Sequence, residues 1–263
     1  MFNKKQIGKL IRVNEMRYTS LKSTEKRESI MDSSCYHHSI GSPKACIQLV
    51  PIFNHLEEKQ MDEIMHTTQS VSFERGSMIY RAEEESDTLY IVNTGRIRIY
   101  RLAESGKEQL VRILEPGDFT GEMALFSPEN TKHESYAEAM MNTKICMIKR
   151  SDLQEYLLKY PSISLKILNE LSQRLEQSEK QTTRFATEKV EARIALFLAE
   201  CLGPEMDTME IALPMSKKDL ASYLGTTPET ISRKLSDLED EGLIKQKPKK
   251  KIQILDLDGL LMV

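Results

Sequence analysis

This chain lacks the long apolar segments and the cysteine framework that mark membrane and secreted proteins. No apolar run in its 263 residues approaches the roughly 20 residues that a helix needs to cross a bilayer. The N-terminus, MFNKKQIGKLIRVNEMRY, lacks the apolar core of a signal peptide. The four cysteines, at positions 35, 46, 146 and 201, are too few and too scattered for a secreted disulfide scaffold. We therefore expect a cytoplasmic protein with no membrane contact.

A large excess of one charge is also missing, since 37 lysines and arginines stand against 40 aspartates and glutamates. This balance excludes a polycation that binds nucleic acid over its whole surface, so any such affinity must come from a local patch. Between residues 46 and 160 the histidines are His55, His66 and His133, with no HxH or HxxxE pair to hold a metal. This pattern disfavours a metal-dependent enzyme, and we expect no catalytic residues.

The first 160 residues divide into two segments of different composition. Residues 1–45 are polar and rich in basic side chains, with little apolar periodicity, which predicts a flexible N-terminal extension. Translation from Met31 instead of Met1 is an alternative here. Residues 46–160 contain short alternating stretches separated by turn signals such as NTG at 93–95. This pattern is typical of an all-β sandwich or barrel, and we assign it to a sensory domain.

Residues 161–186 predict a long helix that breaks near Phe185. Leu168, Leu171 and Leu175 are spaced three and four residues apart, as in the apolar seam of a helical dimer. A helix packed on its own barrel is the alternative, because the seam becomes polar after Leu175.

Residues 187–263 predict a winged helix-turn-helix. Ser216 is suited to cap the N-terminus of a first helix, and Gly225 permits a tight turn after it. Thr227 is suited to cap a second helix that has Pro228 in its first turn. This layout predicts a DNA-binding domain.

The second helix carries chemistry suited to the major groove of double-stranded DNA. Glu229, Ser232 and Arg233 stand at i, i+3 and i+4 and share one face, while Ile231 and Leu235 face the domain interior. An Arg can donate to guanine O6 and N7, a Glu can accept from a cytosine amino group, and a Ser can bind either edge. A solvated, charged helix without DNA function is the alternative.

A lysine-rich stretch, KQKPKKK at 245–251, follows this helix without an acidic residue, as phosphate contacts from a wing require. The predicted DNA contacts are Ser216, Thr227, Glu229, Thr230, Ser232, Arg233, Lys234, Lys247, Lys249, Lys250 and Lys251.

Two motifs resemble the CRP/FNR family of bacterial transcription regulators. GDFTGEMALF at 117–126 resembles its barrel signature, and TPETISRKLSDLEDEGLI at 227–244 resembles its recognition helix and wing start. The resemblance covers about residues 46–258. It implies an α+β fold with an N-terminal cyclic-nucleotide-binding-type β-barrel (jelly roll), a long dimerisation helix and a C-terminal winged helix-turn-helix. It also implies a homodimer that contacts RNA polymerase and binds a palindromic operator with half-sites about 10 base pairs apart.

The resemblance extends to individual residues of the recognition helix and of the barrel. The E-x-x-S-R pattern beginning at Glu229 is similar to the FNR branch, which implies the operator TTGAT-N4-ATCAA. Gly121 and Glu122 match the residues that hold the ribose of a cyclic nucleotide in other members. The Arg-Ser pair that holds the cyclic phosphate aligns here with His133 and Glu134, so we expect no binding of cyclic AMP.

The cysteines carry the favoured signal, redox state. The chain from about Cys46 resembles the FNR-like proteins of Gram-positive bacteria, which implies a reversible disulfide between Cys46 and Cys146. A second hypothesis is an iron–sulfur cluster held by Cys35, His38, Cys46 and Cys146, because CYHHSI at 35–40 resembles the C-x-x-C-S-I of FNR. A third is thiols without a redox role, as we expect for Cys201 on its apolar helix face. Sensing of a small ligand, or constitutive activity, is the alternative to redox control.

Overall fold

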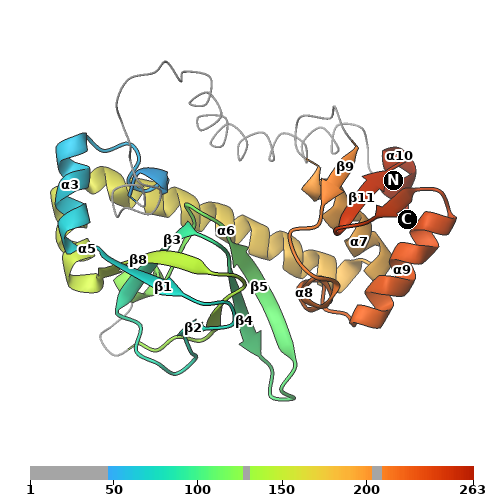
Figure 1. Cartoon of the computed structure of the whole chain (residues 1–263), viewed down its shortest axis with the longest axis horizontal. Helices are drawn as coiled ribbons and strands as arrows, with labels where there is room; N and C mark the ends of the chain where they lie inside the picture. Colours follow the sequence, from blue (N-terminus) through green and yellow to red (C-terminus); the bar gives the residue numbers. More distant parts are fainter. Residues whose placement is uncertain (1–46, 127–130, 203–208) are drawn as a thin grey trace. The chain divides into compact units, whose positions relative to one another are not determined.

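The computed structural model describes residues 47–126, 131–202 and 209–263 (Figure 1). The chain divides into two compact units, with the boundary between Glu179 and Lys180. Among the described residues, no helix is both long enough and apolar enough to cross a membrane.

The first unit is a β-sandwich with helices at both ends of its sequence. Two antiparallel four-stranded sheets have the strand orders β1-β8-β3-β6 and β2-β7-β4-β5, which confirms the predicted all-β sandwich or barrel. Its elements in chain order are α3 (Glu58–Thr67), β1 (Gln69–Phe73), β2 (Met78–Tyr80), β3 (Thr88–Thr94), β4 (Ile97–Leu102), β5 (Glu108–Leu114), β6 (Phe119–Thr120), α4 (Met123–Phe126), β7 (Tyr136–Ala139), β8 (Thr143–Lys149), α5 (Arg150–Lys159) and α6 (Pro161–Thr187), which continues past the boundary.

Strand β4 shows how the alternating pattern builds this sandwich. Ile97 and Ile99 are buried, while Arg98 between them binds Glu138 and Glu108 on the two neighbouring strands, at 2.6 and 2.9 Å. The register shifts after Ile99, so the next residue, Tyr100, is buried as well. The outer face of this strand therefore carries a positive charge, and the arginine that supplies it is paired with acidic side chains.

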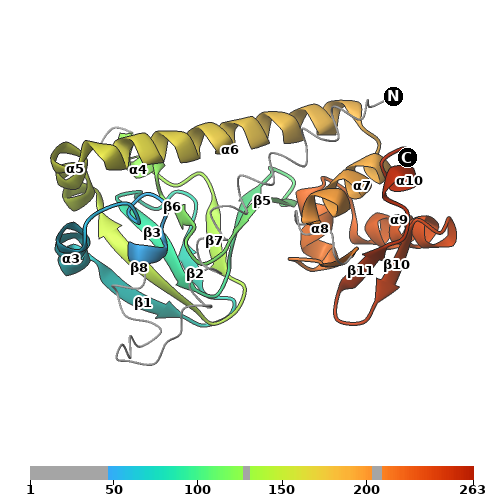
Figure 2. The ribbon, with the colours of Figure 1, turned by 90° about the horizontal axis from the view of Figure 1, so that it is seen from above.

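Helix α6 packs on the sheet that contains β3, β6 and β8 (Figure 2). Ile163 and Ile167 are completely buried in one core with residues of that sheet, and Leu171 is partly buried against the same core. Leu168 and Leu175, on another face of the helix, are 55% and 62% exposed. The leucines predicted to form one seam thus divide between two faces.

The second unit contains a helix-turn-helix and a small antiparallel sheet with strand order β10-β11-β9. Helix α6 ends at Thr187, two residues beyond the predicted break at Phe185. The elements that follow are α7 (Val190–Cys201), β9 (Glu210–Ala212), α8 (Lys217–Tyr223), α9 (Pro228–Asp240), β10 (Ile244–Lys247), β11 (Lys251–Ile254) and α10 (Leu257–Leu260). Helix α9 and the β10–β11 hairpin are labelled in Figure 2.

Candidate nucleic-acid interface

The two helices of the helix-turn-helix begin at the caps that the sequence predicts. The hydroxyl of Ser216 accepts a hydrogen bond from the backbone N–H of Asp219 at 3.1 Å, and Asp219 completes a capping box. The hydroxyl of Thr227 accepts from the N–H of Thr230 at 3.2 Å. Gly225, between the helices, has φ +69°, a backbone conformation that costs a side-chain-bearing residue free energy. These local interactions fix where α9 starts.

Helix α9 presents Glu229, Ser232 and Arg233 on its exposed surface, as predicted. Ile231 and Leu235 are completely buried, so the helix cannot rotate about its axis without exposing apolar surface. The pKa of Glu229 lies below its usual value because its own backbone N–H and the hydroxyl of Thr227 donate to the carboxylate. Near pH 7 this face therefore carries a negative and a positive charge beside a hydroxyl.

Two other predicted contacts on α9 already have partners within the domain. The hydroxyl of Thr230 lies 3.1 Å from that of Thr227. The ammonium of Lys234 lies 3.2 Å from Glu191 on α7 and 3.1 Å from Asp237, and these hydrogen bonds raise its pKa. Lys234 thus joins α9 to α7, and Arg233 is the more exposed cation of the two.

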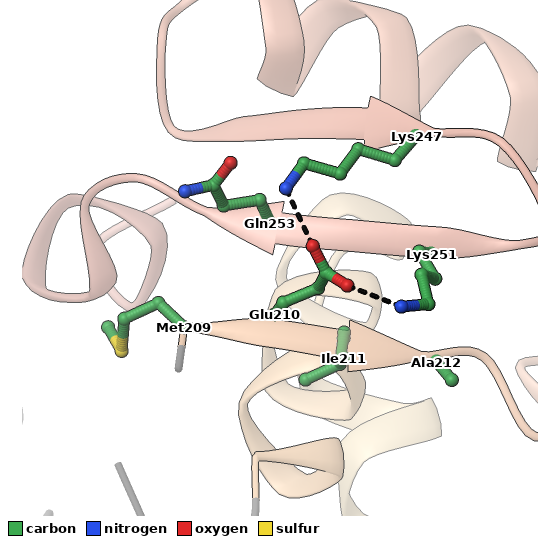
Figure 3. Close-up of a pocket in the computed structure, with 7 residues that line it drawn as sticks. All are labelled: Met209, Glu210, Ile211, Ala212, Lys247, Lys251 and Gln253. Atoms are coloured by element: carbon green, nitrogen blue, oxygen red, sulfur yellow. Dashed lines mark hydrogen bonds and ion pairs between the residues drawn. The ribbon is translucent and has the colours of Figure 1, made fainter. Parts of the chain in front are cut away.

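The hairpin of β10 and β11 places lysines in two environments. Lys249 and Lys250 are exposed at its turn, and both have positive φ, at 59° and 60°. Lys247 and Lys251 face each other across the strands and bind the two carboxylate oxygens of Glu210 at 2.6 and 2.7 Å (Figure 3). Hydrogen bonds from these two lysines lower the pKa of Glu210 to about 2.

Glu210 lies on β9, and the helix-turn-helix separates it in sequence from the lysines that it binds. No acid stands within the lysine stretch itself, so the local sequence predicts unpaired lysines where the fold supplies a carboxylate. A surface hollow surrounds this pair of bonds and is lined by Met209, Glu210, Ile211, Ala212, Lys247, Lys251 and Gln253 (Figure 3).

In the first unit, Gly121 and Glu122 lie between β6 and α4. Gly121 has φ +86°, and a Cβ added to it would lie 2.2 Å from the carbonyl oxygen of Thr88. Only glycine fits this position, so the chain turns here and directs the next side chain inward. The Glu122 side chain is 10% exposed, and its Oε1 lies 3.0 Å from Arg112 and 2.7 Å from Arg174.

The pKa of Glu122 reflects opposing effects of burial and charge. Burial raises it, but the positive charges of Arg112 and Arg174 together with a hydrogen bond from its own N–H outweigh burial, and the net pKa lies below its usual value. The carboxylate is therefore ionised at pH 7 and bound to two guanidinium groups. The barrel signature points to Glu122, but no local sequence pattern points to either of these arginines.

The positions aligned with the phosphate-binding pair have different surroundings. His133 is buried and its ring stacks on Tyr80 with 3.8 Å between centroids. Burial lowers the pKa of His133, while the charges of Glu84 and Asp87 act in the opposite direction. The carboxylate of Glu134 is exposed and binds Arg101 at 2.5 Å. Neither residue supplies the fixed positive charge that a cyclic phosphate needs.

Among the described cysteines, Cys146 is buried on β8 and is disulfide-bonded, whereas Cys201 is free. Burial raises the pKa of Cys201 to about 12, so its thiol stays protonated and unreactive. The other predicted sensor positions, Cys35, His38 and Cys46, lie outside the described residues.

Both units of the chain are similar to known protein domains. Residues 70–160 match the cyclic nucleotide-binding domain, and residues 192–263 match the Crp-like helix-turn-helix domain. The chain is similar to the probable transcriptional regulator Flp of Lacticaseibacillus casei, with 32% identity over 217 residues, covering 82% of this chain and 96% of the relative. It is also similar to the regulatory protein HlyX of Actinobacillus pleuropneumoniae, with 29% identity over 192 residues, covering 72% and 78% respectively.

A solved structure, that of FixK2 from Bradyrhizobium japonicum, matches with a TM-score of 0.62 at 28% identity, covering 73% of this chain and 95% of that chain.

Proposed function

Because the chain belongs to the CRP/FNR family of transcription regulators, we propose that it acts as a homodimer that binds a palindromic operator under redox control. The observation that carries this proposal is the surface of α9. Glu229, Ser232 and Arg233 are exposed there, and the opposite face of the helix is buried in the core. An α-helix of this kind enters the major groove with its N-terminal residues against base edges. RNA polymerase is the expected second partner.

The operator that fits this helix is TTGAT-N4-ATCAA. Arg233 can form two hydrogen bonds with guanine, and the ionised Glu229 can accept from a cytosine amino group. The lysines at the hairpin turn, Lys249 and Lys250, supply phosphate contacts that hold the helix in register without reading sequence. Similarity to the regulators Flp and HlyX supports a role in transcription regulation.

The dimer contact is proposed at the exposed leucines of α6. Leu168 and Leu175 are seven residues apart and so lie on the same face of the helix, and Leu165 beside them is 69% exposed. A monomer would leave this apolar face in water. Two copies related by a two-fold axis would bury it and present two copies of α9 to a palindrome.

Redox control is proposed through a disulfide between Cys46 and Cys146. Cys146 is disulfide-bonded and Cys201 is free. The resemblance of the chain from about Cys46 to the FNR-like proteins of Gram-positive bacteria supports Cys46 as the partner, and Ile47 is completely buried in the same core cluster as Cys146. A sulfur in a disulfide cannot ligate iron at the same time, so this pairing disfavours the iron–sulfur alternative.

The operator assignment is tested by competition between two duplexes at fixed salt. One carries TTGAT-N4-ATCAA and the other a palindrome of TGTGA half-sites, as in the CRP branch. We expect the first duplex to displace labelled DNA at a concentration that is lower by about tenfold or more. One good bidentate contact gives about 1 to 3 kcal/mol of discrimination. Preference for the TGTGA duplex would overturn the operator assignment.

A further inference from the structure

The carboxylate of Glu122 is the centre of a buried ion cluster that joins three elements of the first unit. Arg112 reaches it from β5 and Arg174 reaches it from α6, and both bind the same oxygen, Oε1. The Arg112 guanidinium also donates to the hydroxyl of Thr120 on β6, at 3.2 Å. The arginine side chains are only 27% and 20% exposed, so solvent screens these charges weakly.

Arg174 makes two further contacts with the sheet through Phe119. Its guanidinium carbon lies 4.3 Å from the centre of the Phe119 ring, and its Nη2 donates to the Phe119 carbonyl at 3.1 Å. One side chain of α6 therefore contacts a carboxylate, an aromatic face and a backbone carbonyl. A planar guanidinium can make all three contacts at once, whereas a lysine ammonium would reproduce only some of them.

Arg174 is also the last partly buried residue of α6 in this unit. The inward face of the helix runs through Ile163, Ile167 and Leu171 to Arg174 at helical spacing. Residues 175–180 are all exposed. The ion cluster thus lies at the end of the partly buried face of α6, beside the exposed Leu175.

The same contact lies at the end of a row of paired residues that begins at Cys146. Cys146 on β8 is paired with Ile91 on β3, and Ile91 is paired with Phe119 on β6. All three side chains are buried in one core. A change in the bonding of Cys146 would therefore act on closely packed neighbours of the Arg174 contact.

We propose that Arg174 is the positioning residue that holds α6 on the β-sandwich, through its bonds to the Glu122 carboxylate and the Phe119 carbonyl. This role rests on the proposed function, since a helix positioned by Arg174 matters to DNA binding only if α6 forms the dimer contact.

The test compares three variants of the full chain. Arg174→Met removes the charge and keeps an unbranched side chain, while Glu122 retains Arg112. Arg174→Lys restores a positive charge at the same position. Arg98→Met is the matched control, because Arg98 is 16% exposed and binds two carboxylates, Glu108 and Glu138, on the other sheet.

Two readouts are measured, amide hydrogen exchange of residues 168–178 in the free protein and affinity for the TTGAT-N4-ATCAA duplex. For Arg174→Met we expect exchange to accelerate and DNA affinity to fall, each by about tenfold or more, which corresponds to about 1.4 kcal/mol. Arg174→Lys should recover part of the protection from exchange and part of the DNA affinity. Arg98→Met should leave both within about threefold of the parent protein, a change of less than 1 kcal/mol.

Unchanged exchange in Arg174→Met, or equal effects of the Arg98 and Arg174 changes, would overturn the proposal. Faster exchange with unchanged DNA affinity would also overturn it, because Arg174 would then be structural only. If the parent protein fails to bind the duplex, the proposed function fails, and the exchange comparison still shows whether Arg174 holds the helix.

Discussion

The carboxylate of Glu210 lies 2.6 Å from the ammonium of Lys247, although 36 residues of chain separate them in sequence. Its other oxygen binds Lys251, so two of the four hairpin lysines among the predicted DNA contacts are paired within the protein (Figure 3). The group of Glu210, Lys247 and Lys251 has a net charge of +1 instead of +2. Any phosphate that approaches these lysines competes with this carboxylate.

Replacing the carboxylate is therefore expected to strengthen DNA binding without changing specificity. Glu210→Gln should raise affinity for all duplexes alike, and the slope of log affinity against log salt should steepen by about 0.9, as for one added phosphate contact. Titrations at several salt concentrations check this, with Glu241→Gln, an exposed acid at the end of α9, as a control of equal charge change. A variant that binds no better than this control would show that Glu210 does not compete with DNA.

Base recognition and phosphate binding should separate between α9 and the hairpin turn. Arg233→Ala should cost about 1 to 3 kcal/mol on the cognate operator and relax preference at one base pair, because a bidentate contact is lost. Lys250→Ala should weaken binding to every duplex by a similar factor. Affinities for a set of duplexes with single base changes distinguish the two patterns. Sequence-dependent loss from the Lys250 change would contradict the assignment of the wing.

The cap of α9 should contribute measurably to stability. Thr227→Ala removes the acceptor for the N–H of Thr230 and should lower the free energy of unfolding by about 1 kcal/mol. Ser236→Ala is the comparison, since its hydroxyl binds the carbonyl of Ser232 within the helix, where alanine is tolerated. Urea denaturation measures both variants. Equal stabilities would mean that the cap adds nothing beyond helix propensity.

Two glycines with nearly the same positive φ should respond differently to alanine. Gly121 and Gly76 have φ of +86° and +84°, but an added Cβ meets Thr88 at 2.2 Å in the first and open space in the second. Gly76→Ala should cost about 1 to 2 kcal/mol for the left-handed backbone alone. Gly121→Ala should cost more, because the chain must also move away from Thr88. Thermal unfolding of the pair tests this, and equal costs would place the strain in the backbone only.

Interactions between neighbours in sequence were predictable, and the caps at Ser216 and Thr227 show why. Each depends on a side chain and an N–H three residues later, so the local sequence determines the outcome. The buried face of α9 followed from helical spacing for the same reason. The register shift after Ile99 was not predictable, because no residue type marks it. The shift leaves both Ile99 and Tyr100 buried, whereas simple alternation would expose one of these two neighbours.

Contacts between distant residues were not predictable from one sequence. Arg174 is 52 positions from Glu122, and Lys234 is 43 positions from Glu191. Each pair forms because the fold brings two elements together, and charge alone does not select a partner among 37 basic and 40 acidic residues. Glu122 could therefore be predicted as a site residue from its motif, but the arginines that bind it could not.

The most direct test of the account is the affinity of the protein for a TTGAT-N4-ATCAA duplex at fixed salt in two thiol states. Metal-free protein reduced with dithiothreitol is compared with protein oxidised with diamide, and Cys46→Ser and Cys201→Ser are measured alongside. We predict affinities that differ by about tenfold or more between the two states, equivalent to about 1.4 kcal/mol. The difference should disappear in Cys46→Ser and persist in Cys201→Ser. Equal affinities in the two states, or no preference over a scrambled duplex, would contradict the account.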